Sequence, residues 1–371
     1  MEQTPHAPPP KPAPVTAADD AMASPQGKRF DWVDVAKGFC IIMVVMMHST
    51  LGVEKAVGET SWMGAIVEFA RPFRMPDFFL ISGLFLSRVI DRDWRSFLDR
   101  RVVHFLYFYL LWLTIQFVFK GPGMALDEGV GAMLRAYVLA IFVEPFGTLW
   151  FIWMLPVFAL VVRLTRGVPA PLMLLVGAAL EIAPIETGFT AIDEFAGRFV
   201  YFYAGYALAR HVFAAADWTG RRKTAAGLLL ALWALVELAA VLSGWSTGPG
   251  VSLALGVAGA LAVIAMATLL IDVPQVGKAL RFLGEHSIVV YLAFFLPMVV
   301  MRTALLKTGI IADIGLVSLI TTVFAVIVPL LIWWASLKVG WNFLFERPAW
   351  AHLYPGRQPI GPNRAVLEAS K

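Results

Sequence analysis

The sequence is poor in charge and almost free of cysteine. Of its 371 residues only 15% are charged, and Cys40 is the one cysteine. A single cysteine excludes an intramolecular disulfide and a cysteine-based metal cluster, and inside an apolar run it is expected to be a small buried hydrophobe. We predict no metal site. So little charge does not cover the surface of a soluble domain of this size.

What the chain has in place of charge is apolar and aromatic surface. Hydrophobic residues make up 59% of it, with 13 Trp and 27 Phe. Ten apolar runs are long enough to span a bilayer, at about 20 residues each. We therefore predict an all-α, polytopic integral membrane protein with about ten transmembrane helices, embedded in the lipid bilayer. The expected spans are 32–52, 75–89, 102–119, 148–166, 169–185, 197–211, 224–243, 250–271, 287–306 and 314–338.

The two ends of the chain differ from its middle. Residues 1–28 contain seven prolines and few large apolar side chains, which predicts a disordered, Pro-rich cytoplasmic tail and not a signal peptide. Residues 29–345 form the predicted ten-helix transmembrane domain, and residues 346–371 a cytoplasmic C-terminal tail. Basic residues gather in alternate loops, which by the positive-inside rule puts both termini in the cytoplasm. The net charge of +4 comes from these loops, so no nucleic-acid partner is expected.

The first span carries three ionisable residues, Asp34, Lys37 and His48. Eleven residues separate Lys37 from His48, which is three turns plus about 20°, so the two share a helix face about 16 Å apart. Asp34 and Lys37 can pair at i, i+3. Such a polar stripe favours a cavity wall, with His48 as a general base; the alternatives are an interfacial ion pair and a helix–helix hydrogen bond.

Two arginines, Arg71 and Arg74, come just before the second expected span. They can bind an acceptor or stabilise an oxyanion, and the alternative is snorkelling to lipid headgroups. Pro72 and Pro76 predict a break in the helix at this point.

The segment that joins the second and third expected spans is densely basic. Arg100, Arg101 and His104 are its candidates for gripping the phosphates of a nucleotide-bearing donor, and the alternative is ordinary positive-inside bias. Candidates for cavity lining elsewhere are Trp150, Ser287, Tyr291, Glu144, Arg198, Tyr201 and Glu237.

Four segments, in order along residues 30–338, resemble the membrane-bound acyltransferase family of type three. Lys37 and His48 in RFDWVDVAKGFCIIMVVMMHS resemble the family's basic-residue–ten–histidine motif, and MPDFFLISGLFL resembles its second-helix signature. TLWFIWMLPVFAL is similar to its LWFL segment, and FLGEHSIVVYL to its late serine–tyrosine helix. The family includes O-acetyltransferases and succinyltransferases of bacterial polysaccharides and glucans.

The resemblance implies a bacterial inner-membrane enzyme that uses cytoplasmic acyl-CoA as a co-substrate, with no bound cofactor, and a carbohydrate or glycoconjugate as extracytoplasmic acceptor. It implies that His48 acts in acyl transfer and that Lys37 stands where the family often has arginine. Two positions depart from the pattern: His104 replaces the second arginine of an Arg-x-x-Arg motif, and Phe294 replaces a late histidine. Without the extra soluble domain of some members, the chain acylates the acceptor itself or hands the group to a periplasmic partner protein.

Two other functions fit the polar stripe. A transporter or flippase for a lipid-linked sugar or small metabolite would use it as a substrate path. A non-catalytic subunit of an envelope machine would need none of its side chains for chemistry.

Overall fold

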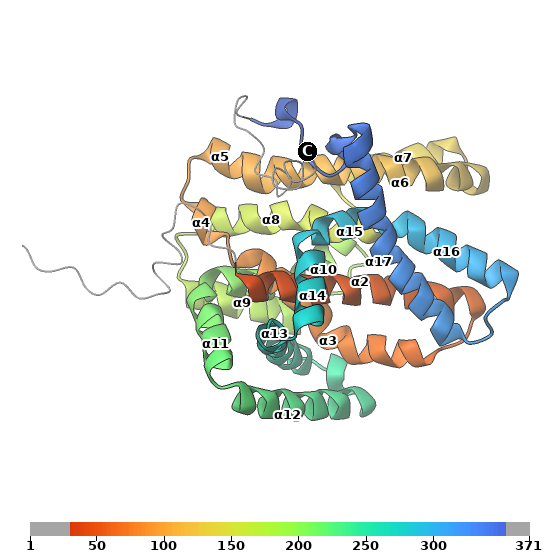
Figure 1. Ribbon diagram of the computed structural model, residues 1–371. Coiled ribbons are helices and arrows are strands. Elements are labelled where there is room, and N and C mark those ends of the chain that lie inside the picture. Colours follow the sequence, from red (N-terminus) through yellow and green to blue (C-terminus); the bar gives the residue numbers. More distant parts are fainter. Residues whose placement is uncertain (1–29, 354–371) are drawn as a thin grey trace, which may run out of the picture.

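The computed structural model describes residues 30–353, and this part of the chain is helical, with no β-strand. The predicted N-terminal tail lies outside the described residues, as does the C-terminal tail beyond residue 353. Most of the long helices run side by side in one bundle (Figure 1). The first half contains α2 (Asp31–Val57), α3 (Trp62–Gly83), α4 (Ser87–Ile90), α5 (Trp94–Leu98), the π-helical turn η1 (Asp99–Val103), α6 (His104–Glu128), α7 (Val130–Phe142), the short turn η2 (Gly147–Leu149), α8 (Trp150–Leu164) and α9 (Ala170–Ile182). The second half contains α10 (Thr190–Ala207), α11 (Ala209–Arg221), α12 (Lys223–Leu242), α13 (Val251–Leu270), α14 (Pro274–Glu285), α15 (Ser287–Ala293), α16 (Phe295–Thr308) and α17 (Ile314–Val339), with the short turns η3 (Trp245–Thr247), η4 (Asn342–Leu344) and η5 (Ala349–Ala351).

Within the described residues, six helical stretches are long and apolar enough to cross a membrane, or seven if the bent pair α15–α16 counts as one span. The six are Asp31–Val57, Trp94–Glu128, Val130–Leu164, Lys223–Leu242, Val251–Leu270 and Ile314–Val339. The expected count of about ten is therefore not reached by these criteria. Helix α9 has 13 residues, and α15 and α16 are bent by 56°. Helices α3 and α10 are long, but each carries three or more charged side chains.

Helix α2, which holds the polar stripe, lies at the centre of the bundle and packs against α14, α17, α3 and α13. It meets α14 where two glycines face carbonyl groups. A β-carbon at Gly284 would overlap the carbonyl oxygen of Asp34, and one at Gly38 would overlap that of Leu280. The two backbones approach this closely because neither glycine has a side chain. This crossing fixes the position of α2 near Lys37.

The predicted break at Pro72 and Pro76 is wrong, because α3 continues through both prolines to Gly83. A proline inside a helix removes a backbone hydrogen bond, but packing on neighbouring helices tolerates it. Helix α3 has that support from α10 and α13. The continuous helix carries Arg74, Asp77 and Phe78 through the centre of the bundle instead of ending beside it.

Candidate active site

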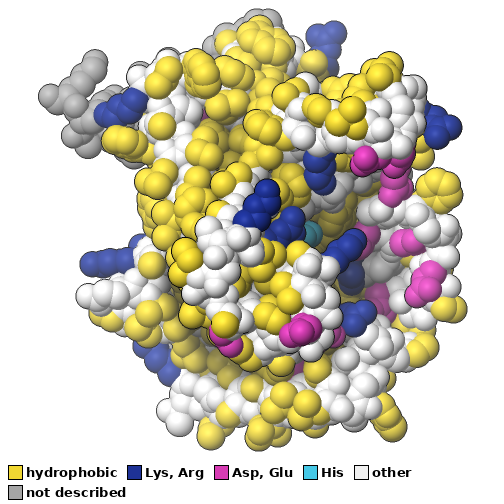
Figure 2. Space-filling view, turned by 90° about the vertical axis from the view of Figure 1, so that its right-hand side faces the viewer, with side chains coloured by type: hydrophobic (Ala, Val, Ile, Leu, Met, Phe, Trp, Pro, Cys, Tyr) yellow, Lys and Arg dark blue, Asp and Glu magenta, His cyan; other side chains and the backbone are white. Residues whose placement is uncertain are grey.

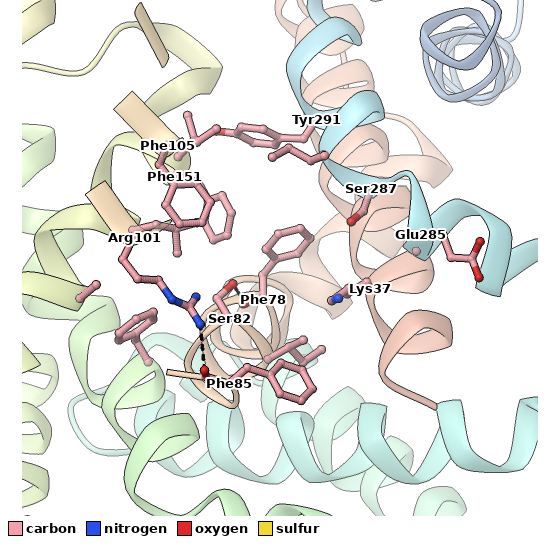
Figure 3. Close-up of a pocket in the computed structure, with 17 residues that line it drawn as sticks. Lys37, Phe78, Ser82, Phe85, Arg101, Phe105, Phe151, Glu285, Ser287 and Tyr291 are labelled. Atoms are coloured by element: carbon pink, nitrogen blue, oxygen red, sulfur yellow. Dashed lines mark hydrogen bonds between the residues drawn. The ribbon is translucent and has the colours of Figure 1, made fainter. Parts of the chain in front are cut away.

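A cavity of about 310 Å³ lies between α2, α3, α8 and α15, near the beginning of α2. Its polar lining includes Lys37, Ser82, Arg101 and Ser287. The Lys37 ammonium and the Arg101 guanidinium reach into it from opposite walls (Figure 3). Both cations have partners in the protein: Lys37 Nζ lies 3.5 Å from Asp34 Oδ1, as the i, i+3 spacing predicts, and Arg101 Nη2 donates to the Phe85 carbonyl oxygen at 2.8 Å.

The position of Arg101 depends on the segment around η1. Arg347, near the end of the described chain, pairs with Asp99 at 2.8 Å and also donates to its carbonyl oxygen. Arg163 of α8 is buried and donates to the carbonyl oxygens of Ile90 and Arg92. Buried arginines bound in this way hold an irregular backbone in place because they satisfy its carbonyl groups.

The other two expected donor ligands do not line this cavity. The His104 ring lies against Phe105 and Phe108, with centroids 5.3 and 5.2 Å away, and is near Arg347 and Asp99. The π-helical turn changes the phase between Arg100 and α6, so neighbouring residues here point to different sides. Of the three expected donor ligands, the structure places Arg101 alone in the cavity lining.

A second cavity, of about 230 Å³, lies further along α2 and contains His48. Arg74, Thr148, Trp150 and Tyr291 also line it. The His48 ring packs against Phe294 with centroids 5.5 Å apart, and no side chain or carbonyl among residues 30–353 hydrogen-bonds its nitrogens. An imidazole in this state keeps both nitrogens for a ligand.

The Arg74 guanidinium is the charged group close enough to act on the His48 ring. Arg74 is buried, its Nη1 donates to the Val67 carbonyl oxygen at 3.4 Å, and its Nε has no hydrogen-bond partner in the described part of the chain. Arg71 lies elsewhere: it is exposed, pairs with Glu68 at 3.2 Å and does not line the cavity. The two arginines thus lie in different places: Arg74 lines the His48 cavity and Arg71 does not.

Three aromatic residues, Phe78, Phe151 and Tyr291, line both cavities. The rings of Phe78 and Phe151 meet edge to face with centroids 4.6 Å apart, and those of Phe151 and Tyr291 at 5.5 Å. The Tyr291 hydroxyl donates to the Thr148 carbonyl oxygen at 2.5 Å. A single aromatic layer therefore divides the Lys37 cavity from the His48 cavity, and both cavities lie along one face of α2.

Comparison with known proteins agrees with the family that the four segments resemble. The family model described as an acyltransferase domain, that of the acyltransferase 3 family, matches residues 30–337. The chain belongs to this family. The match to an acyltransferase domain and the six or seven apolar helical stretches in the described residues fit a multi-pass membrane protein of this family.

The chain is also similar to the inner membrane protein YcfT of Escherichia coli strain K12, with 34% identity over 83 residues. This match covers 19% of the chain and 23% of the relative, so the chain spans less than a quarter of the length of that curated relative. No solved structure matches the chain.

The family match gives context to residues that the sequence did not single out. Phe78 and Phe151 lie inside two of the four family-like segments, MPDFFLISGLFL and TLWFIWMLPVFAL, yet nothing in the sequence marks them as a shared wall. Among the expected lining residues, Trp150, Ser287, Tyr291 and Arg198 do line a cavity. Glu144, Tyr201 and Glu237 line neither of the two; Glu144 accepts from the Thr190 backbone N–H at 3.1 Å instead.

Proposed function

We propose that this acyltransferase moves an acetyl or succinyl group from cytoplasmic acyl-CoA to a hydroxyl of an extracytoplasmic carbohydrate or glycoconjugate. The observation that carries the proposal is the pair of cavities along α2, which share Phe78, Phe151 and Tyr291. An acceptor of this kind does not cross a bilayer, so the thioester has to reach it inside the protein. Two cavities that meet at one aromatic layer offer such a route.

The donor enters the cavity that holds Lys37 and Arg101. We assign this end to the cytoplasm, since it lies next to the basic segment between α3 and α6. The two cations bind the anionic part of the donor, and the apolar aromatic walls accept its arm. The thioester carbonyl carbon then lies at the aromatic layer, away from bulk water.

His48 acts from the other side as the general base. Its free imidazole nitrogen accepts the proton of the acceptor hydroxyl while the hydroxyl oxygen bonds to the thioester carbon. Arg74 stabilises the oxyanion of the tetrahedral intermediate. The carbon–sulfur bond then breaks, the thiolate of CoA takes the proton from the imidazolium, and His48 returns to its neutral form. The thioester is consumed, and an ester and a free thiol are formed.

The test begins with donor binding to purified protein in nanodiscs, followed by thermal unfolding with acetyl-, succinyl- and free CoA. The variants are Arg101→Gln and, as a matched control from the same basic segment, Arg95→Gln, which is exposed and outside the cavity. We expect a CoA thioester to stabilise the wild type and the control but not Arg101→Gln. A folded preparation that responds to no CoA thioester would contradict the proposal.

The acceptor is identified by deleting the gene in the source organism and measuring ester-linked acyl groups on envelope carbohydrates by mass spectrometry. Wild-type complementation restores the ester, and His48→Ala does not. Retention of the ester in the His48→Ala strain would exclude the mechanism.

A further inference from the structure

Helix α6 carries a buried amide that has no partner, four residues before a lysine. Gln116 is 1% exposed, and neither its side-chain oxygen nor its nitrogen forms a hydrogen bond within residues 30–353. Lys120 lies one helical turn further on the same face. Leaving a buried amide without partners costs free energy unless a ligand or water completes its bonds.

Lys120 sits over two aromatic rings. Its Nζ is 4.7 Å from the centroid of Phe146 and 4.4 Å from that of Phe295. A β-carbon placed on Gly147 would lie 3.6 Å from Lys120 Nζ and 3.9 Å from Gln116 Oε1. The ammonium and the amide therefore both lie next to Gly147, the first residue of η2.

A second cation in this region is Arg302, on α16. The two charges are close enough to repel one another. A β-carbon at Gly52 would lie 2.5 Å from Arg302 Nη1. Gly52 is one turn after His48 on α2, so the Arg302 guanidinium lies about 6 Å further along the helix axis than His48.

No carboxylate of the described residues forms an ion pair with Lys120 or with Arg302. Glu54, two residues after Gly52, accepts from Ser61, and Glu144, three residues before Gly147, accepts from the Thr190 backbone N–H. The arginines Arg71 and Arg198, in contrast, each have a glutamate partner. Lys120 and Arg302 are thus a pair of like charges that nothing in the described chain neutralises.

The space-filling view of this end shows a hollow bordered by Lys and Arg side chains, with acidic side chains to its right and below it (Figure 2). Two adjacent residues connect Lys120 to His48: the Phe294 ring packs on His48, and Phe295 lies under Lys120. On the other wall, Phe146 is followed closely by Thr148, which lines the His48 cavity. Gln116, Lys120 and Arg302 therefore lie beside the His48 cavity without lining it.

We propose that Gln116, Lys120 and Arg302 form a subsite for an anionic group, a carboxylate or a phosphate, on the acceptor. This rests on the proposed function and narrows its substrate class to acidic glycans or phosphate-bearing glycoconjugates. The two cations neutralise the anion, and the Gln116 amide donates to one of its oxygens. The anion binds about one helical turn from His48, so it belongs to the acylated sugar or to its neighbour.

The experiment compares two probes that differ in one group: p-nitrophenyl β-D-glucuronide and the neutral p-nitrophenyl β-D-glucoside. Dissociation constants are measured by thermal unfolding of the full chain in nanodiscs of neutral lipid, with D-glucose 1-phosphate as the phosphate probe. The variants are Lys120→Gln and Arg302→Gln. Lys307→Gln is the matched control, because Lys307 is exposed on the same helix as Arg302.

We expect the wild type and Lys307→Gln to bind at least one anionic probe at least tenfold more tightly than the glucoside. In Lys120→Gln and Arg302→Gln the ratio of the dissociation constants of the glucoside and the anionic probe falls toward one. Both variants still unfold cooperatively without ligand, which shows that they are folded. Equal or absent binding of anionic and neutral probes in the wild type overturns the proposal. An anionic preference that is unchanged in both Lys120→Gln and Arg302→Gln overturns it as well.

Two further arms separate this proposal from its alternatives. Nanodiscs that contain phosphatidylglycerol test for a lipid headgroup: loss of the anionic preference there, with glucoside binding unchanged, assigns the site to lipid and contradicts an acceptor subsite. Stabilisation by acetyl- and succinyl-CoA is measured on the same samples. Its absence counts against the proposed function alone, because the probe ratio is scored without a donor.

Discussion

The two cavities along α2 differ in how their polar groups are satisfied. In the cavity at the beginning of α2, Lys37 pairs with Asp34 and Arg101 binds the Phe85 carbonyl. In the cavity further along, the His48 ring and Arg74 Nε have no hydrogen-bond partner within the described residues. The first is also the larger, about 310 against 230 Å³.

We relate this difference to the two proposed tasks of the site, donor binding at the Lys37 cavity and acyl transfer at the His48 cavity. Side chains that are already bonded keep a fixed position, which suits the binding of a large donor. Side chains that lack partners retain their hydrogen-bonding capacity for the reacting groups, which suits proton transfer and oxyanion stabilisation. Substitutions at the two ends should therefore have different kinetic signatures.

The largest expected effect is on kcat, for a substitution in the His48 cavity. His48→Gln should lower kcat at least 100-fold, since a positioned general base contributes about 10²–10⁴-fold. Donor binding should remain unchanged. Product is measured by mass spectrometry, with His211→Gln, an exposed histidine on α11, as the matched control. An equal loss of kcat in His48→Gln and His211→Gln would contradict a specific role of the His48 cavity in the reaction.

The next largest effect is expected for a substitution that displaces α2, because α2 contributes Lys37 to one cavity and His48 to the other. In Gly284→Ala the new β-carbon overlaps the Asp34 carbonyl oxygen, so α2 and α14 must separate at a cost of about 1–3 kcal/mol. Thermal unfolding should show a lower midpoint, and donor binding should weaken. Gly227→Ala on α12 is the control, since a β-carbon there meets nothing within 4 Å. An unchanged midpoint in Gly284→Ala would show that the crossing is looser than described.

A smaller effect tests the layer between the cavities. Phe78→Leu removes part of the ring that meets Phe151, so water should reach the thioester and acceptor-independent release of CoA thiol should rise several-fold. Thiol release is followed with a thiol-reactive dye. Phe69→Leu, on the same helix but outside both cavities, should leave the rate unchanged. No difference between the two variants would mean that the layer does not exclude water.

The smallest expected effect concerns the like charges of Lys120 and Arg302. Arg302→Gln removes a cation that repels Lys120, so the ligand-free protein should gain about 0.5 kcal/mol of stability. The unfolding midpoint of Arg302→Gln is compared with that of Lys307→Gln, which should match the wild type. A lower midpoint for Arg302→Gln would show that Arg302 has a structural role.

The helical class and the stripe of Asp34, Lys37 and His48 could be predicted from the sequence because they depend on composition and on helical periodicity within one segment. The count of about ten spans stays a prediction: among the described residues six or seven stretches are long and apolar enough, and a hydropathy run does not show that α15 and α16 bend or that α9 is short. The same limit explains the error at Pro72 and Pro76, where packing on α10 and α13 outweighs a local rule.

Of the candidate site, the part that depends on spacing within one helix could be predicted, and the part that depends on contacts between helices could not. Spacing along α2 brings Lys37 and His48 to one face, but no spacing relates Phe78 to Phe151, which come from different helices. The π-helical turn at residues 99–103 also changes the phase of the basic segment, so Arg101 lines the cavity while His104 turns toward Arg347. Contacts between distant segments and a local change of helix type are set by tertiary packing.

Sealed vesicles of known orientation show whether the acyl group passes from one face of the membrane to the other. Inverted and right-side-out vesicles from the source organism receive radiolabelled acyl-CoA on the outside, and an impermeant esterase then reports where the labelled ester lies. We expect labelled ester in inverted vesicles alone, protected from the esterase until the vesicles are opened, and no labelled ester with His48→Gln. Labelled ester on the outside of right-side-out vesicles would contradict it.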